Sequence, residues 1–409
     1  MEEHKEARFI VDTLANAGFV AYYAGGWVRD LILRHPSDDI DIATNAPPET
    51  IQALFPHTVP IGLAFGIILV IIDGKQYEVA TFRQDLAYKD GRRPTKIAFA
   101  TAIEDAKRRD FTINGMFFDP LKEEILDFVR GRDDLEKKLI RAIGNPHQRI
   151  HEDRLRMIRA VRLACRFHFT IEEETAKAIR AHAKELFPAV AIERIAQEFK
   201  KSHDFGHLRP MLICLHEFGL LQEIFPALKK ISLEEISHRL SPTQYYPLEA
   251  PVIAFLLLLF PRSTLDEELQ LCKFLKLSNV DLRFVSFLYH TKLLITISRP
   301  IERCEWAHFY AHAFSSLALQ ILSAPLEISK RTAFLKEHQE KRALLDRFIQ
   351  RIQEENPIVT SDDLKSLGIK PGPQMGQLLR EAERIAINEE LYEPTQILER
   401  LQSLFLWPK

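Results

Sequence analysis

The chain has 409 residues, which is more than a single hydrophobic core usually organises, so two to four domains are expected. Hydrophobic residues make up 46% of the chain and charged residues 27%, as is typical of a soluble globular protein. The formal net charge of -2 does not by itself indicate a nucleic-acid binder, and it does not exclude one, because binding depends on local patches.

The ends and the apolar runs of the sequence favour a cytoplasmic protein with no membrane partner. The charged N-terminus, residues 1–6, lacks the apolar core of a signal peptide. The longest apolar run, Val252–Phe260, is too short to span a bilayer and predicts a buried helix. The four cysteines are scattered without a Cys-x-x-Cys pair, which argues against a zinc site and against a disulfide framework.

Roughly the first 130 residues predict a mixture of strands and helices, and almost everything after Leu135 predicts helices. The elements expected in the mixed part are a helix over 4–17, a strand over 20–24, a helix over 28–33, an acidic strand over 39–43, a helix opening at 47–49, and a hairpin of strands 67–72 and 76–82. Asp73-Gly74 between the last two strands is a strong signal for a tight turn. The polar stretch 85–94 is expected to be a mobile loop.

Two aspartates, Asp39 and Asp41, are the most informative residues of the chain. On a strand, residues i and i+2 share a face, so these carboxylates would stand side by side with Ile40 turned into the core. Neighbouring carboxylates repel each other, and Mg²⁺, which also binds substrate phosphates, would remove that conflict. We therefore predict Asp39 and Asp41 as catalytic metal ligands, although an acidic strand end at the surface would give the same pattern.

Two neighbouring segments extend this candidate site. The turn Gly25-Gly26 followed by Arg29 exposes backbone and suggests a place for a triphosphate. Glu78, on the second strand of the expected hairpin, is a candidate third carboxylate, although a lone Glu on a strand is more often simply exposed.

The basic segment Lys107–Met116 combines positive charge with apolar residues. Arg109 could hold triphosphate oxygens, and Asp110 and Asn114 could read ribose hydroxyls or orient the arginines. A basic turn that caps a helix is the simpler explanation of the same residues.

Residues 151–167 predict one amphipathic helix, with Asp153, Arg156, Arg159 and Arg162 outside its apolar face. Cytosine and adenine both present an amine donor beside an acceptor nitrogen, whereas uracil and guanine reverse this order. An acceptor on Asp153 and a donor on Arg156 would therefore accept C and A and reject U and G. Arg159 and Arg162 would contact phosphates or hold this template. A solvated, salt-bridged helix face is the ordinary alternative.

Five segments, in this order, resemble motifs of the class II (bacterial-type) tRNA nucleotidyltransferases and the related poly(A) polymerases. They are Gly25–Asp30 with Asp39–Thr44, Arg108–Asn114, Asp127–Leu135, Glu152–Arg156 and Glu193–Glu198. An ordered set over residues 20–200 is far more specific than any one motif. Gly115, where Ala is more usual, and the stretch Gly62–Gly66 depart from the common pattern and leave the branch of the family open.

The resemblance implies an α+β nucleotidyltransferase head of the DNA polymerase beta type, with a mixed sheet and helices, followed by an all-α neck, body and tail. We expect these four parts over residues 1–138, 139–205, 206–350 and 351–409. It also implies two Mg²⁺ ions on Asp39 and Asp41, which activate the RNA 3′-hydroxyl while pyrophosphate leaves. The implied nucleotide-binding residues are Gly26, Arg29, Arg109, Asp110, Asn114, Asp153, Arg156, Arg159 and Arg162.

The expected activity is the addition of CCA, or part of it, to the 3′ ends of tRNA from CTP and ATP. The expected loop 85–94 favours the full activity, because the family uses a flexible element there when it switches from CTP to ATP. A poly(A) polymerase or an A-only adding enzyme that uses ATP is the alternative, since the motifs are shared. A non-catalytic RNA-binding protein on an inactive scaffold is a third reading, and the intact pair Asp39 and Asp41 argues against it.

Overall fold

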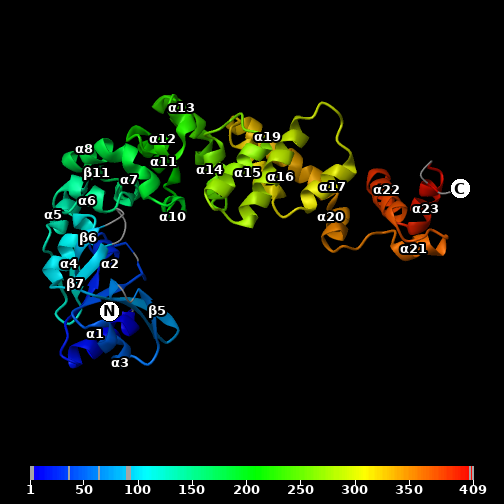
Figure 1. The fold of residues 1–409 in the computed structure, drawn as a ribbon. Coiled ribbons are helices and arrows are strands. Elements are labelled where there is room, and N and C mark those ends of the chain that lie inside the picture. Colours follow the sequence, from blue (N-terminus) through cyan, green and yellow to red (C-terminus); the bar gives the residue numbers. More distant parts are fainter. Residues whose placement is uncertain (1–3, 36, 63–64, 89–93, 405–406, 408–409) are drawn as a thin grey trace. The chain divides into compact units, whose positions relative to one another are not determined.

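The computed structural model describes residues 4–35, 37–62, 65–88, 94–404 and 407. The contacts within the chain divide it into two compact units, Met1–Ser237 and His238–Lys409. In Figure 1 the labelled strands belong to the first unit, and helices make up nearly all the rest. The α+β head followed by helical parts is confirmed, and the finer division into head, neck, body and tail stays a prediction.

The head is built on a seven-stranded mixed sheet with the strand order β3-β4-β5-β2-β1-β8-β9. Its strands are β1 (Ala21–Ala24), β2 (Asp41–Thr44), β3 (Thr58–Gly62), β4 (Ile67–Ile72), β5 (Lys75–Thr81), β8 (Phe117–Asp119) and β9 (Glu124–Leu126). β2 and β5 are parallel, and the other neighbours are antiparallel. The strands β3, β8 and β9 were not expected from the sequence.

The predicted hairpin is confirmed as β4 and β5, in which Ile72 pairs with Lys75. Both turn residues, Asp73 and Gly74, have positive φ, which is the backbone that an Asp-Gly turn supplies. On the other side of β5, Val79 lies opposite Ile42 of β2. This register places Glu78 and Asp41, one residue earlier on each parallel strand, next to each other at the exposed end of β2.

Helices pack against the sheet through apolar residues spaced by three or four positions. The clearest is α1, which buries Ala7, Ile10, Val11 and Leu14 and matches the predicted helix over 4–17 closely. The helical elements of the head are α1 (Lys5–Asn16), α2 (Gly26–Ile32), α3 (Pro48–Leu54), α4 (Ala102–Arg108), η3 (Thr112–Asn114) and α5 (Gly131–Glu136).

The segment 85–94 differs from the expected loop. Residues 85–88 belong to β6 (Arg83–Tyr88), and Pro94 begins β7 (Pro94–Phe99). These two strands pair antiparallel in a separate sheet. The prediction of a loop was therefore wrong for both ends of the segment, and residues 89–93 lie outside the described residues.

After the head, the first unit continues mainly as helices. They are α6 (Pro146–Glu152), α7 (Leu155–Phe167), α8 (Glu173–His182), η4 (Ala183–Glu185), α9 (Leu186–Ala189), α10 (Ile192–Asp204), α11 (Leu208–Glu217), α12 (Leu220–Ile224), η5 (Pro226–Leu228) and α13 (Leu233–Arg239). Two short strands, β10 (Leu139–Ile140) and β11 (Thr170–Ile171), pair in parallel beside them.

The single helix predicted over 151–167 is wrong, because the chain breaks between α6 and α7. Asp153 has an extended backbone, with φ -149° and ψ 104°. Its carboxylate accepts a hydrogen bond of 3.1 Å from the Leu155 backbone N–H. An Asp side chain can satisfy a backbone donor two residues onward in this way, which competes with helix formation and starts α7 afresh.

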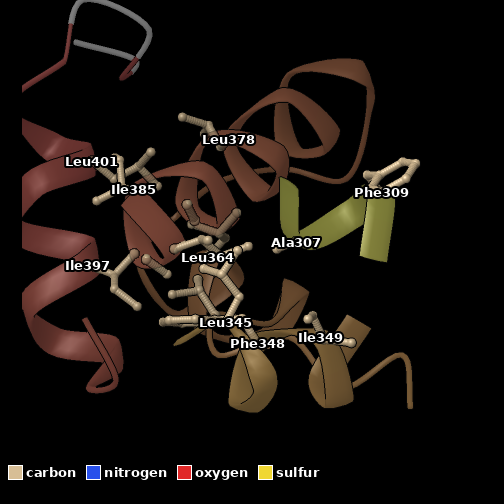
Figure 2. Close-up of a cluster of buried hydrophobic side chains, with 14 of the residues drawn as sticks. Ala307, Phe309, Leu345, Phe348, Ile349, Leu364, Leu378, Ile385, Ile397 and Leu401 are labelled. Atoms are coloured by element: carbon tan, nitrogen blue, oxygen red, sulfur yellow. The ribbon is translucent and has the colours of Figure 1, made fainter. Parts of the chain in front are cut away.

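The second unit is helical. Its elements are η6 (Ser241–Tyr245), α14 (Val252–Leu257), α15 (Leu265–Phe274), α16 (Asn279–Thr296), α17 (Arg303–Ala311), α18 (Ser315–Ser323), α19 (Ile328–Leu344), α20 (Asp346–Gln353), α21 (Ser361–Ser366), α22 (Pro373–Glu389) and α23 (Pro394–Gln402). Figure 2 shows one core in which Ala307, Phe348, Leu378 and Leu401 of four helices meet. This core contains residues from both sides of residue 350. In the described part of the chain, no helix combines the length and apolar character that crossing a membrane requires.

Candidate active site

Asp39 and Asp41 lie at the start of β2 and are both exposed, whereas Ile40 and Ile42 are buried. The predicted alternation is therefore confirmed, although β2 begins at Asp41 and Asp39 precedes it. The buried isoleucines anchor the strand in the core, which leaves both carboxylates at its accessible end.

The environment of Asp41 concentrates negative charge. Burial of its carboxyl group, together with the negative charges of Asp39 and Glu78, raises the pKa of Asp41 to about 6, although the charge of Arg109 opposes this rise. The side chain still reaches solvent. A cation bound to these oxygens would favour the ionised form, and carboxylate oxygens are the ligands that Mg²⁺ prefers.

The described residues hold no group of three or more His, Cys, Asp or Glu side chains arranged to bind a metal ion. Glu78 therefore contributes to the field at Asp41 without joining such a group. The donor set fits an ion held by two aspartates that takes its remaining oxygen ligands from substrate phosphates and water, as is common for Mg²⁺.

The turn before α2 brings the phosphate-binding candidates next to the aspartates. Gly25 has φ +70°, and a Cβ atom there would lie 3.1 Å from Nη1 of Arg109 and 3.8 Å from Oδ2 of Asp41. Its N–H donates to the Met116 carbonyl. Only glycine fits both this backbone and this space, so the glycine turn, a guanidinium and a carboxylate converge here.

Arg109 is positioned by a buried carboxylate that the sequence analysis missed. Asp105 accepts hydrogen bonds from Nε and Nη2 of Arg109, at 3.2 and 3.1 Å, and it also pairs with Arg108. The Arg109 guanidinium lies 4.8 Å from the centre of the Phe117 ring. The spacing of three and four residues along α4 is the signal that could have identified Asp105.

A chain of hydrogen bonds connects Arg29 to α7. Nη1 of Arg29 donates to Oδ1 of Asn114 at 2.7 Å, and Nδ2 of Asn114 donates to Oδ1 of Asp110 at 3.1 Å. Nε and Nη2 of Arg159 donate to Oδ2 of Asp110 at 2.8 and 2.6 Å. Asp110 and Asn114 were predicted either to read ribose hydroxyls or to orient arginines. These contacts fit the second role.

The same chain ends on Glu198 of α10. Arg162 donates through Nε to Oε2 of Glu198, and Nη1 of Arg159 lies 3.8 Å from Oε1. Burial opposes ionisation of Asp110, but the charge of Arg159 and the hydrogen bonds from Asn114 and Arg159 keep the pKa of Asp110 below its ordinary range. Arg162 is buried with Glu198, so its contacts are those of a residue that holds α7 in place.

Asp153 and Arg156 are close in sequence but are held by different partners. Both oxygens of Asp153 accept hydrogen bonds from Arg194 of α10, at 3.1 and 2.7 Å. Arg156 donates through Nη1 to Glu152 and to the Arg149 carbonyl, and through Nη2 to the Arg108 carbonyl. The structure thus orients both proposed base-reading groups before any nucleotide binds.

Comparison with known proteins identifies the family. A model described as the poly A polymerase head domain matches residues 21–141, and one described as the probable RNA and SrmB-binding site of polymerase A matches residues 168–231. A CCA-adding enzyme of Pediococcus pentosaceus is 36% identical over 406 residues, which is 95% of each chain. One of Streptococcus mutans is 32% identical over 403 residues, covering 97% of this chain and 96% of the relative. This chain belongs to the CCA-adding enzyme family.

The fold of the family agrees over the whole length. The crystal structure of the Bacillus stearothermophilus CCA-adding enzyme in complex with CTP superposes with a TM-score of 0.79 at 27% identity, covering 98% of each chain. Within this CCA-adding enzyme fold, Gly115 is explained by packing. A Cβ atom at Gly115 would lie 2.7 Å from Cγ2 of Val129 and 2.9 Å from Cδ1 of Ile143, so these two side chains occupy the space of a methyl group.

The sequence analysis of this CCA-adding enzyme homologue missed the residues that form ion pairs with the predicted site residues. Asp105, Glu152, Arg194 and Glu198 each pair with a predicted arginine or aspartate. Arg194 and Glu198 lie in a segment that had been matched to a family motif without any role for its residues. The signal for them was therefore present, but their partners lie far away in the sequence.

Proposed function

We propose that this chain adds CCA, or part of it, to the 3′ ends of tRNA from CTP and ATP. Its similarity to CCA-adding enzymes along the full chain supports this activity. The observation on the structure that carries the proposal is the convergence of Asp39, Asp41 and Arg109 beside the glycine turn at Gly25. This arrangement offers oxygen ligands, a cation and a glycine turn in one place, as nucleotidyl transfer requires.

Asp39 and Asp41 would hold Mg²⁺, which when bound would activate the RNA 3′-hydroxyl and stabilise the charge that develops on the phosphates. Arg109 would pair with the triphosphate from the position in which Asp105 holds it. Gly26 and Arg29 would contact the incoming nucleotide from the start of α2. Because Arg29 is buried and bound to Asn114, its part is mainly to set the position of this turn.

Asp153 and Arg156 would read the base with the hydrogen-bonding capacity that remains to them. A carboxylate has about four acceptor positions and a guanidinium five N–H groups. The contacts among the described residues use three of the acceptors of Asp153 and three of the N–H groups of Arg156. One acceptor and two donors therefore remain, which is enough for the amine and the ring nitrogen of C or A.

Asp110, Asn114, Arg159 and Arg162 would position this template relative to the metal site. They link η3 of the head to α7 and α10, so the base-reading residues and the carboxylates share one hydrogen-bonded framework. The helices that follow would bind tRNA by its shape and its phosphates. The match of residues 168–231 to a family model of an RNA-binding site supports this assignment.

The test is nucleotide addition to tRNA transcripts that end before, within and after the CC of the CCA end. Each transcript is incubated with the purified protein, Mg²⁺ and one labelled nucleotide at a time. We expect CTP to enter transcripts that lack CC, ATP to enter only those that end in CC, and neither to enter a complete end. Addition of many A residues with ATP alone would instead establish the poly(A) polymerase alternative.

A non-catalytic scaffold is tested in the same assay with Asp41→Ala. Addition should be abolished in this variant while binding of tRNA, measured by filter retention, is largely preserved. Persisting addition would show that the metal assignment to Asp41 is wrong.

A further inference from the structure

The two proposed base-reading residues lie at the break between α6 and α7. Asp153 follows the last residue of α6 and has an extended backbone. Arg156 lies in the first turn of α7, and its guanidinium donates to the Arg149 carbonyl of α6. α6 packs against both α7 and α8 in the first unit (Figure 1). The distance between the acceptor that remains to Asp153 and the donors that remain to Arg156 therefore depends on how the backbone is held at this break.

The side chain of Arg154 joins the two helices at the break. Its backbone forms the N-cap of α7, but its side chain makes no capping hydrogen bond there. Instead, Nη1 donates to the His151 carbonyl of α6 at 3.3 Å, and Nη2 lies 3.3 Å from Nδ1 of the His151 ring. A guanidinium at this place satisfies a carbonyl in the last turn of α6, where a positive charge is also favourable.

Glu185, at the end of η4, fixes the position of Arg154. Oε2 of Glu185 accepts a hydrogen bond of 3.1 Å from Nη2 of Arg154. Its Oε1 lies 2.7 Å from Nδ1 of His182 at the end of α8. The hydrogen bonds and charges of His182 and Arg154 hold the pKa of Glu185 below its ordinary value, although burial opposes this. The carboxylate is therefore ionised at neutral pH, and both neighbours donate to it.

The same set of contacts returns to α6 near its beginning. Nε2 of His182 lies 3.0 Å from Nδ1 of His147, in the first turn of α6. Since Nδ1 of a neutral His182 ring carries the proton that it donates to Glu185, its Nε2 accepts from His147. α6 is thus joined to the segment 182–185 near both of its ends, by His147 at the start and by Arg154 at the break.

Two separate sets of contacts therefore act on the base template. Arg194 of α10 bonds the carboxylate of Asp153. Arg154 and Glu185 instead hold the backbone before and after that residue. We propose that Arg154 and Glu185 are positioning residues for base selection. By fixing the break they set the distance between the acceptor of Asp153 and the donors of Arg156. This inference rests on the proposed function, because it concerns how the template of that reaction is held.

The loss of these contacts should affect nucleotide binding and base choice and should preserve the chemical step. Among the described residues, the two positioning residues form no hydrogen bond or ion pair with Asp39, Asp41 or Arg109. The site of phosphoryl transfer should therefore keep its geometry. A looser template binds the correct base less tightly and excludes a wrong base less strictly.

The experiment measures the addition of CTP, over a range of concentrations, to a tRNA transcript that ends before CC, with the full-length folded protein and Mg²⁺. Arg154→Met and Glu185→Ala should each raise the KM for CTP about fivefold or more and change kcat by less than about twofold. The incorporation of UTP relative to CTP should rise about threefold or more in both variants. A purely structural defect would lower the active fraction, so kcat would fall while KM and the UTP ratio stayed constant, and this result would overturn the inference.

Arg8→Met in the head is the matched control. Arg8 also donates to a carboxylate, that of Asp12, and to a backbone carbonyl, that of Pro120. Because these contacts are not at the break, the control should keep the KM for CTP and the UTP ratio of the unmodified protein. A control that changed both values as much as Arg154→Met would refute the special role of the break.

Two further variants test whether Arg154 and Glu185 act as a pair through their hydrogen bond. The double variant of Arg154→Met and Glu185→Ala should raise KM no more than the larger single effect, and effects that multiply would refute the pair. Glu185→Gln should keep the KM within about twofold of the unmodified value, because its amide oxygen still accepts from Arg154 and His182 can accept from the NH₂ group as its other tautomer. A loss as large as that of Glu185→Ala would contradict the hydrogen bond.

The same assay separates this inference from the proposed function. If the unmodified protein added neither CTP nor ATP to tRNA, the proposed function and this inference would both be wrong. If the unmodified protein added them, and Arg154→Met and Glu185→Ala kept its KM and its base choice, only the positioning role would be wrong.

Discussion

Replacing Asp110 by Asn would disrupt the hydrogen bonds that connect the head to α7, although the two side chains have almost the same shape. The two carboxylate oxygens accept four hydrogen bonds, from the Phe111 backbone, from Asn114 and twice from Arg159. The amide of Asn has one acceptor oxygen and one NH₂ group where Asp has two acceptor oxygens. The NH₂ group must therefore face either the donor of Asn114 or the donors of Arg159. Either Asn114 or Arg159 would therefore face a donor in place of an acceptor.

The expected loss follows from the burial of this ion pair. Removing one partner of a buried pair costs about 3–5 kcal/mol. The Arg159 side chain is 31% exposed and keeps Glu198 at 3.8 Å, so we expect a smaller loss of about 2–3 kcal/mol in the free energy of unfolding at pH 7. Because the pKa of Asp110 is lowered in the folded protein, this contribution is present above the unfolded pKa of about 3.9 and is lost as the pH falls below it.

Urea unfolding followed by Trp27 fluorescence measures this loss. Of the three tryptophans only Trp27 lies in the first unit, so Trp306→Phe and Trp407→Phe leave one reporter for the unit that contains Asp110. The matched control is Asp12→Asn in the same unit, because its ion pair with Arg8 is exposed and should be worth at most about 1 kcal/mol. Equal losses in the two variants would refute the framework argument, and so would a difference that persists unchanged at pH 3.

Three further predictions concern the metal site, the base template and a buried histidine. Asp41→Asn should lower the rate of nucleotide addition at least about a thousandfold, because the proposed metal ion loses a ligand. Asp38→Asn is the control and should keep the rate of the unmodified protein. Equal rates in the two variants would contradict the assignment of Asp41 as a metal ligand. The Arg156→Ala variant should incorporate UTP or GTP in assays with one nucleotide at a time. Unchanged selectivity for CTP and ATP would contradict the proposal that Arg156 reads the base. Burial lowers the pKa of His338 to about 4, so the free energy of unfolding of the second unit should fall by about 2–3 kcal/mol as the pH drops from 6.5 toward 4. Urea curves followed by Trp306 should show this fall, and His338→Gln should abolish it.

Local patterns in the sequence predicted the head well. The apolar period of α1, the Asp-Gly turn between β4 and β5, and the alternation around Asp39 and Asp41 are all present in the structure. Each of these depends on residues within a few positions of one another, where backbone geometry and burial leave few choices. The family and its activity were likewise predictable, because five motifs occur in order.

Predictions failed where a side chain competed with a periodic pattern. The apolar spacing over 151–167 is helical throughout, but the Asp153 carboxylate bonds the Leu155 N–H and interrupts the helix. Periodicity describes which faces are apolar and contains no information on such a local competition. The polar composition of residues 85–88 was similarly consistent with a loop, although the pairing of β6 with β7 makes them a strand.

The sequence by itself predicted the candidate active site of this protein, since two acidic side chains on one strand face, a glycine turn and an arginine can be recognised from neighbouring positions. Only the tertiary structure decided which charges pair with which. Asp110 meets Arg159 across 49 residues, and Asp153 meets Arg194 across 41. With 55 basic and 57 acidic residues in the chain, the sequence allows many such pairs, and the packing of η3, α7 and α10 selects the ones that form.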